Sequence, residues 1–128
     1  MADAISKDQL KEALDQYVII DVREPDEVEN GKIENSQSMP LGLLIRNIKK
    51  GQIDELKQEK VCVYCASGYR GNIGTDELVK AGFSAVNLDG GYAAWSKSIW
   101  IIAYKNLKPL SKVNHHITSN LLIIISWI

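Results

Sequence analysis

Cysteine is scarce in this sequence: the chain has two, Cys62 and Cys65, and they lie three positions apart. Two cysteines so close together cannot form the disulfide framework of a small secreted protein. The first residues also lack the basic and then apolar run that is typical of a secretory signal. We therefore expect free thiols in a reducing compartment, the cytoplasm.

Long apolar runs and basic clusters are absent as well. No stretch reaches the roughly 18 consecutive apolar residues that a membrane-spanning helix requires, so no membrane span is expected. The net charge is −1, and no cluster of lysine and arginine alternates with aromatic residues, which argues against nucleic-acid binding. The two histidines, His115 and His116, are adjacent and have no further ligands at suitable spacing, so no metal site is expected. No cofactor is expected either.

Charge is distributed unevenly along the chain. All 16 acidic residues precede Gly90, whereas residues 90–128 carry four lysines and no acidic residue. A length of 128 residues suffices for one domain with a hydrophobic core. The change in charge predicts that this domain spans residues 1–98 and that residues 99–128 form a C-terminal tail.

Short apolar runs alternate with amphipathic segments. The runs are apolar at successive positions, which is typical of parallel strands that are buried on both faces. Ser6 and Gln9 can form a capping box for a first helix, whose apolar face extends to Tyr17. The fold class is therefore predicted to be α/β, with a mainly parallel sheet flanked by helices on both faces. Strands are expected over residues 18–20, 36–39, 60–64 and 85–88, and further helices over 25–30, 41–50, 72–81 and 92–97.

The stretch from Val61 to Gly71 combines a β-branched strand, Cys65, a loop of small residues and Arg70. A strand that leads into a tight loop and a helix N-terminus points successive backbone N–H groups into one small space. Such a nest favours negative charge and gives a cysteine at its rim thiolate character. We therefore expect Cys65 to be a nucleophile in an anion-binding cradle, at the edge of a parallel sheet where ligands bind.

Each of these residues also has a simpler interpretation. Cys65 would then be a buried structural cysteine, and Arg70 a solvated arginine, although the positive end of a helix disfavours an arginine without an anionic partner. Cys62 lies within the strand and faces the opposite side from Cys65, so core packing is favoured over a resolving thiol. Tyr69 either shapes the mouth of the site or is an exposed loop aromatic.

Four motifs, taken in order and spacing, resemble the rhodanese-type sulfurtransferases. They are Asp21-Val22-Arg23-Glu24, Met39-Pro40-Leu41, Cys65-Ala66-Ser67-Gly68-Tyr69-Arg70 and Leu88-Asp89-Gly90-Gly91-Tyr92-Ala93-Ala94-Trp95. The resemblance extends over roughly residues 5–97. The run at residues 68–71 is particularly similar to single rhodanese domains that are appended to flavin-dependent disulfide reductases. Glu34 and Asn35 depart from the family pattern, which usually has proline and glycine there.

The resemblance implies that Cys65 takes sulfane sulfur as a persulfide from a small anionic donor, thiosulfate or another persulfide. The acceptor would be a thiol or cyanide, and a partner reductase or a sulfur-carrier protein is a further candidate partner. Arg70 would brace the loop and attract the donor, and Asp21 and Arg23 would make structural contacts near the site. The loop residues implied to bind the substrate are Ala66, Ser67, Gly68, Tyr69 and Gly71.

Two other functions stay open at this point. Cysteine phosphatases and arsenate reductases of similar fold carry five residues between cysteine and arginine, whereas this chain has four between Cys65 and Arg70. A smaller ring should crowd a tetrahedral oxyanion. A non-catalytic binding or regulatory module is the third alternative, although inactive relatives typically lack the cysteine that this chain keeps.

Overall fold

The computed structural model of the protein describes residues 2–97. The expected C-terminal tail, residues 99–128, lies outside the described residues, and the proposed division of the chain at residue 98 stays a prediction. Within residues 2–97, no helix has the length and apolar character needed to cross a membrane.

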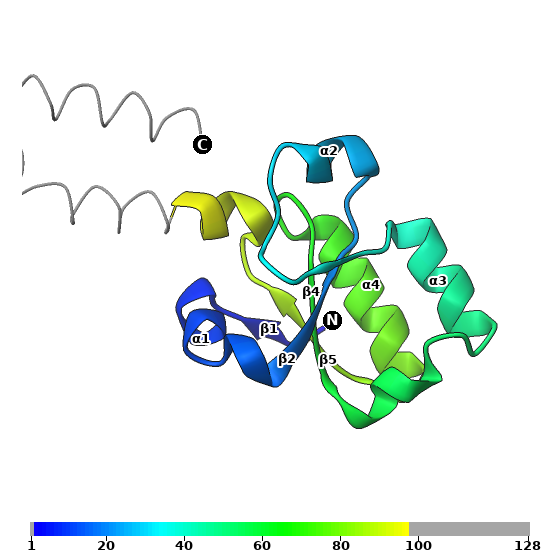
Figure 1. The fold of residues 1–128 in the computed structure, drawn as a ribbon. Helices are drawn as coiled ribbons and strands as arrows, with labels where there is room; N and C mark the ends of the chain where they lie inside the picture. Colours follow the sequence, from blue (N-terminus) through cyan, green and yellow to red (C-terminus); the bar gives the residue numbers. More distant parts are fainter. Residues whose placement is uncertain (1, 98–128) are drawn as a thin grey trace, which may run out of the picture. The chain divides into compact units, whose positions relative to one another are not determined.

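One parallel sheet of five strands forms the centre of the described chain, in the order β1-β5-β4-β2-β3 (Figure 1). In the register of the sheet, Asp21 lies opposite Tyr64, and Val63 lies opposite Asn87. The carboxyl ends of β2, β4 and β5 therefore meet at one edge. The strands are β1 (Ala4–Ile5), β2 (Tyr17–Asp21), β3 (Gln37–Ser38), β4 (Lys60–Tyr64) and β5 (Ser84–Leu88).

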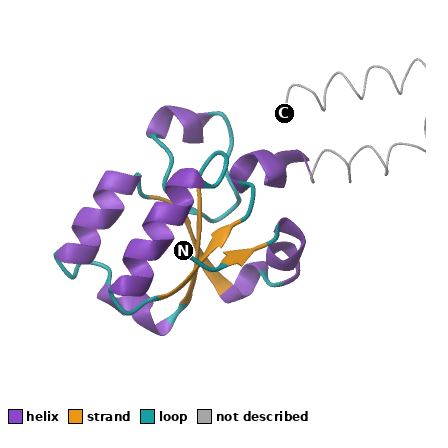
Figure 2. Cartoon of the chain, turned by 180° about the vertical axis from the view of Figure 1, so that it is seen from behind, coloured by secondary structure: helices purple, strands orange, loops and turns teal. Residues whose placement is uncertain are grey.

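Helices cover both faces of this sheet (Figure 2), which confirms the predicted α/β class. Leu44 of α3 and Leu78 of α4 belong to one apolar cluster, whereas Leu10 of α1 and Trp95 belong to the other. The helices are α1 (Lys7–Glu12), α2 (Pro25–Glu29), α3 (Leu41–Lys49), α4 (Tyr69–Lys80) and a last helical segment over residues 91–97. Two short 3₁₀ helices, η1 (Leu14–Gln16) and η2 (Asp54–Gln58), complete the described chain.

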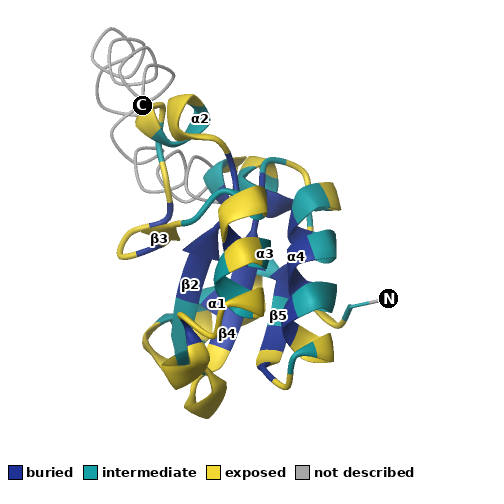
Figure 3. Cartoon of the chain, turned by 90° about the vertical axis from the view of Figure 1, so that its right-hand side faces the viewer, coloured by how far each residue is buried: buried dark blue, intermediate teal, exposed yellow. Residues whose placement is uncertain are grey.

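Successive residues of β4 contribute to opposite clusters, as the geometry of a strand requires. Val61, Val63 and Cys65 pack with α3 and α4, whereas Cys62 and Tyr64 pack on the other face. All five are almost wholly buried, and Figure 3 shows the central strands as the buried layer of the fold. Burial raises the pKa of the Cys62 thiol to about 12. Cys62 thus packs in the core on the opposite face of the sheet from Cys65.

Two helix boundaries differ from the prediction. The capping box of Ser6 and Gln9 forms as expected, but α1 ends at Glu12 and Tyr17 pairs with Lys60 in the sheet. Strand pairing therefore overrides the helical pattern before Tyr17. At α4, Gly68 adopts a left-handed conformation with φ of 116° and ends the loop, so the helix begins at Tyr69 rather than at residue 72.

The turn that departs from the family pattern is nevertheless formed. The amide of Ser36 donates a hydrogen bond to the carbonyl of Ile33 at 3.1 Å. Asn35 has φ of 66°. Asparagine tolerates this left-handed conformation better than other residues with a side chain, so it can replace glycine here.

Neighbouring residues of α4 test how the fold is stabilised. We expect Leu78→Ala to lower the free energy of unfolding by about 2–5 kcal/mol, because it opens a cavity in a closely packed core. Val79, half exposed on the same helix, is the matched control, and Val79→Ala should change stability far less. Urea unfolding of both variants measures this, and equal losses would contradict the assigned core.

Candidate active site

Cys65 directly follows β4, and its side chain is buried, with 1% of the residue exposed. Its Sγ atom accepts a hydrogen bond from the amide of Gly68 at 3.0 Å. This contact closes the loop back onto the sulfur. The loop thus directs the backbone amide of Gly68 at Cys65 Sγ.

The segment after β5 holds the first half of this loop. The amide of Tyr92 donates to the carbonyl of Cys65 at 2.8 Å, and the amide of Ala93 donates to that of Ala66 at 3.0 Å. Gly91 allows this approach, because a Cβ atom there would lie 2.4 Å from the Cys65 carbonyl oxygen. The two backbone segments are therefore held in direct contact.

Asn87 of β5 holds the second half of the loop. Its Nδ2 donates to the carbonyl of Gly68 at 3.0 Å, on the residue whose amide contacts Cys65. Its Oδ1 is buried and has no hydrogen-bond partner among the described residues. Gly71 leaves room for this amide group, since a Cβ atom there would lie 2.3 Å from Asn87 Oδ1. Sequence reasoning missed Asn87, which it assigned only to a strand.

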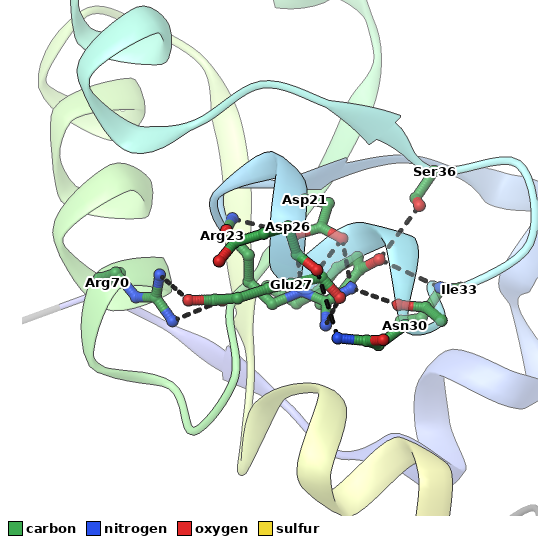
Figure 4. Close-up of polar contacts among 10 residues, drawn as sticks. Asp21, Arg23, Asp26, Glu27, Asn30, Ile33, Ser36 and Arg70 are labelled. Carbon is green, nitrogen blue, oxygen red and sulfur yellow. Dashed lines mark hydrogen bonds and ion pairs between the residues drawn. The ribbon is translucent and has the colours of Figure 1, made fainter. Parts of the chain in front are cut away.

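Arg70 forms a two-pronged ion pair with Glu27 of α2 (Figure 4). Its Nη1 and Nη2 donate to Glu27 Oε1 and Oε2, each at 3.0 Å, and both side chains are about one third exposed. These hydrogen bonds raise the pKa of Arg70 above its ordinary value, against partial burial. The carboxylate of Glu27 is therefore the anionic partner of Arg70 within the protein. The sequence analysis missed this pair, because it assigned Glu27 only to the start of a helix.

A buried ion pair connects the end of β2 to α2. Arg23 Nη2 lies 2.7 Å from Asp21 Oδ2 and also donates to the carbonyl of Gly31 at 2.7 Å, while Nη1 donates to that of Glu27 at 3.4 Å. Burial raises the pKa of Asp21, but hydrogen bonds from Arg23 outweigh it, so this pKa lies below its ordinary value. Asp21 and Arg23 thus position the helix that carries Glu27.

The other predicted site residues lie around the loop. Ala66, Ser67 and Gly68 form it, Gly71 is buried behind it on α4, and Tyr69 is the first residue of α4 and 77% exposed. No group of three potential metal ligands occurs among residues 2–97. A cavity of about 440 Å³ lies elsewhere, between η1, β2 and residues 34–37, and none of the loop residues lines it.

Comparison with known proteins identifies the family. A family model described as the rhodanese-like domain matches residues 6–98. The chain belongs to the rhodanese-like family. It is also similar to a mitochondrial protein of Schizosaccharomyces pombe provisionally named thiosulfate sulfurtransferase, with 36% identity over 92 residues. The match covers 64% of this chain and 65% of that protein, so the chain spans less than two thirds of that relative's length.

Solved structures share the fold. A rhodanese-related protein from Thermoplasma volcanium superposes with a TM-score of 0.66 at 29% identity, covering 75% of this chain and 92% of that one. The reduced CoADR-RHD protein of Bacillus anthracis has a TM-score of 0.64 at 24% identity, covering 74% of this chain and 16% of that one, and shows a shared fold. The predicted rhodanese-type fold is confirmed. A further relative, from Allochromatium vinosum, is named simply as a sulfurtransferase and is 30% identical over 101 residues, which cover 76% of this chain and 91% of that protein.

The low pKa of Asp21 predicts a dependence of stability on pH. The ion pair stabilises the fold fully above the ordinary carboxyl pKa of about 4, and this contribution is lost as the pH falls through the lowered, folded-state pKa. At neutral pH, Asp21→Asn should cost about 3–5 kcal/mol, because it leaves Arg23 buried without its partner.

The difference between the wild type and Asp21→Asn should shrink in acid, as measured by urea unfolding across a pH series. Asp15→Asn, which removes an exposed carboxylate, is the control and should have a small effect at every pH. A gap that stays constant down to the acid limit of the series would contradict the assignment.

Proposed function

We propose that the chain is a sulfurtransferase in which Cys65 carries sulfane sulfur as a persulfide. The observation that supports this most directly is the hydrogen bond from the Gly68 amide to Cys65 Sγ, at the carboxyl end of a central parallel strand. A sulfur atom that accepts backbone hydrogen bonds is stabilised as an anion. The names of the relatives point to the same class of reaction.

The proposed transfer has two steps. The Cys65 thiolate attacks the outer sulfur of thiosulfate, the S–S bond to the sulfonate breaks, and sulfite leaves with the electron pair. A thiolate or cyanide then attacks the outer sulfur of the Cys65 persulfide, which restores the Cys65 thiolate. No strong general acid is required, because sulfite is already a stable anion when it leaves.

The cradle is proposed to consist of backbone donors. The first N–H groups of α4, which include those of Tyr69, Arg70 and Gly71, have no acceptor within the helix and are available to an anion. Ala66, Ser67 and Gly68 provide the loop that precedes them. We propose that these amides hold the outer sulfur, with Asn87 fixing the Gly68 peptide in position.

The phosphatase alternative is disfavoured by the position of Arg70. In that chemistry the arginine binds the oxyanion itself through its planar fork. Here both terminal nitrogens of Arg70 are engaged by Glu27, and only Ala66, Ser67, Gly68 and Tyr69 separate Arg70 from Cys65. A non-catalytic binding or regulatory module would require no reactive thiol, whereas this chain keeps Cys65 beside the loop.

A reducing compartment would keep Cys65 free between turnovers, so the proposal retains the cytoplasm as the location. It also retains a thiol as acceptor, supplied as a small molecule, a partner reductase or a sulfur-carrier protein. The exposed ring of Tyr69, next to the loop, is available for such an acceptor to contact.

Mass spectrometry after treatment with thiosulfate tests the proposal. We expect a gain of one sulfur atom on the peptide that contains Cys65, and cyanide should remove it and yield thiocyanate. Cys65→Ser should abolish both signals, because the nucleophile is lost. Cys62→Ala is the matched control and should keep both, since Cys62 faces the opposite core.

Sulfur found on Cys62 instead would contradict the proposed nucleophile. If no sulfur is transferred but a phosphate ester is hydrolysed in a reaction that depends on Cys65, the phosphatase alternative replaces the proposal. If neither reaction occurs, the binding module replaces it.

A further inference from the structure

The ion pair between Arg70 and Glu27 determines what the site presents to a donor. Both carboxylate oxygens of Glu27 accept from the two terminal nitrogens of Arg70 at 3.0 Å (Figure 4). A paired arrangement of this kind uses the edge of the guanidinium that would otherwise bind an incoming oxyanion. A donor such as thiosulfate must therefore displace Glu27 or bind without a direct contact to that edge.

Arg23 holds the backbone of Glu27 in place. Arg23, which is buried and paired with Asp21, donates to the carbonyl oxygens of Glu27 and Gly31, at the end of α2. A shift of α2 away from Arg70 would break these contacts. The carboxylate of Glu27 is thus fixed near Arg70 by the fold, beyond what the exposed ion pair alone would achieve.

The surroundings of Arg70 carry further negative charge. Glu24, which directly precedes α2, is exposed, and the charge of Arg23 is balanced by Asp21. Glu24 also interacts electrostatically with Arg70. Acidic residues at the mouth of a site slow the approach of anions, and most of all of anions with two charges. The side chains on this side of the loop therefore disfavour a dianion.

We infer that Glu27 determines donor selectivity: it occupies Arg70 and makes the site favour a persulfide of low charge over dianionic thiosulfate. This inference rests on the proposed function. In the favoured reaction, the Cys65 thiolate attacks the outer sulfur of RSSH, the S–S bond breaks, and RS⁻ leaves with the electron pair. The outer sulfur keeps its hydrogen, so Cys65–S–SH and RS⁻ are the products.

Donor kinetics on Glu27→Gln test the inference. The probes are thiosulfate, a dianion, and cysteine persulfide, whose ammonium and carboxylate charges cancel, so that its persulfide group leaves it at most one net negative charge. The ratio of kcat/KM for thiosulfate to that for cysteine persulfide should rise about three- to tenfold, because one negative charge beside Arg70 is removed. The gain should shrink as salt is added, since screening weakens the effect of the removed charge.

Glu29→Gln is the matched control, because it removes the same charge from the same helix and Glu29 forms no ion pair within residues 2–97. It should change the ratio less than twofold. Glu27→Ala is measured in parallel, so that the result does not depend on one substitution. In an Arg70→Met background, Glu27→Gln should change the ratio by a much smaller factor, because the guanidinium that Glu27 occupies is absent. This comparison separates an effect through Arg70 from a structural one.

The outcomes distinguish this inference from the proposed function. If neither donor places sulfur on Cys65 in the wild type, the proposed function fails. If both donors react but Glu27→Gln and Glu27→Ala leave the ratio unchanged, the inference on Glu27 is wrong. An equal rise in Glu29→Gln, or a rise of undiminished size in the Arg70→Met background, would also overturn it.

Discussion

The amide of Gly68 donates a hydrogen bond to Cys65 Sγ at 3.0 Å, and the loop can make this contact because Gly68 adopts φ of 116°. A residue with a side chain reaches this conformation only at a cost in free energy. The same conformation ends the loop and begins α4, so one backbone geometry sets both the contact to the sulfur and the start of the helix. The proposed chemistry of Cys65 depends on this geometry.

Two independent contacts hold the loop in this shape. From the β5 side, Asn87 binds the Gly68 carbonyl, and Gly91 lets the following backbone approach Cys65. From the β2 side, α2 reaches Arg70 through Glu27. The first contact is neutral and is made by a buried residue, whereas the second is charged and partly exposed. We therefore assign positioning of the sulfur to the first contact and selection among donors to the second.

Contacts between near neighbours in the chain could be predicted from the sequence. The capping box of Ser6 and Gln9 spans three positions, and the apolar run of β4 together with the small residues after it places Cys65 at a strand end. The pair of Glu27 and Arg70 spans 43 positions, so it could be found only once the fold brought α2 to α4. The overlong first helix has the same cause, because the pairing of Tyr17 with β4 competes with its local helical pattern.

A crystal structure of the protein after loading with a sulfur donor tests the central claim most directly. The account predicts an outer sulfur on Cys65 that lies within hydrogen-bond distance of the amide nitrogens of the loop and of the first turn of α4. An outer sulfur that points into the apolar core, or a loop whose amides turn away from it, would contradict the account.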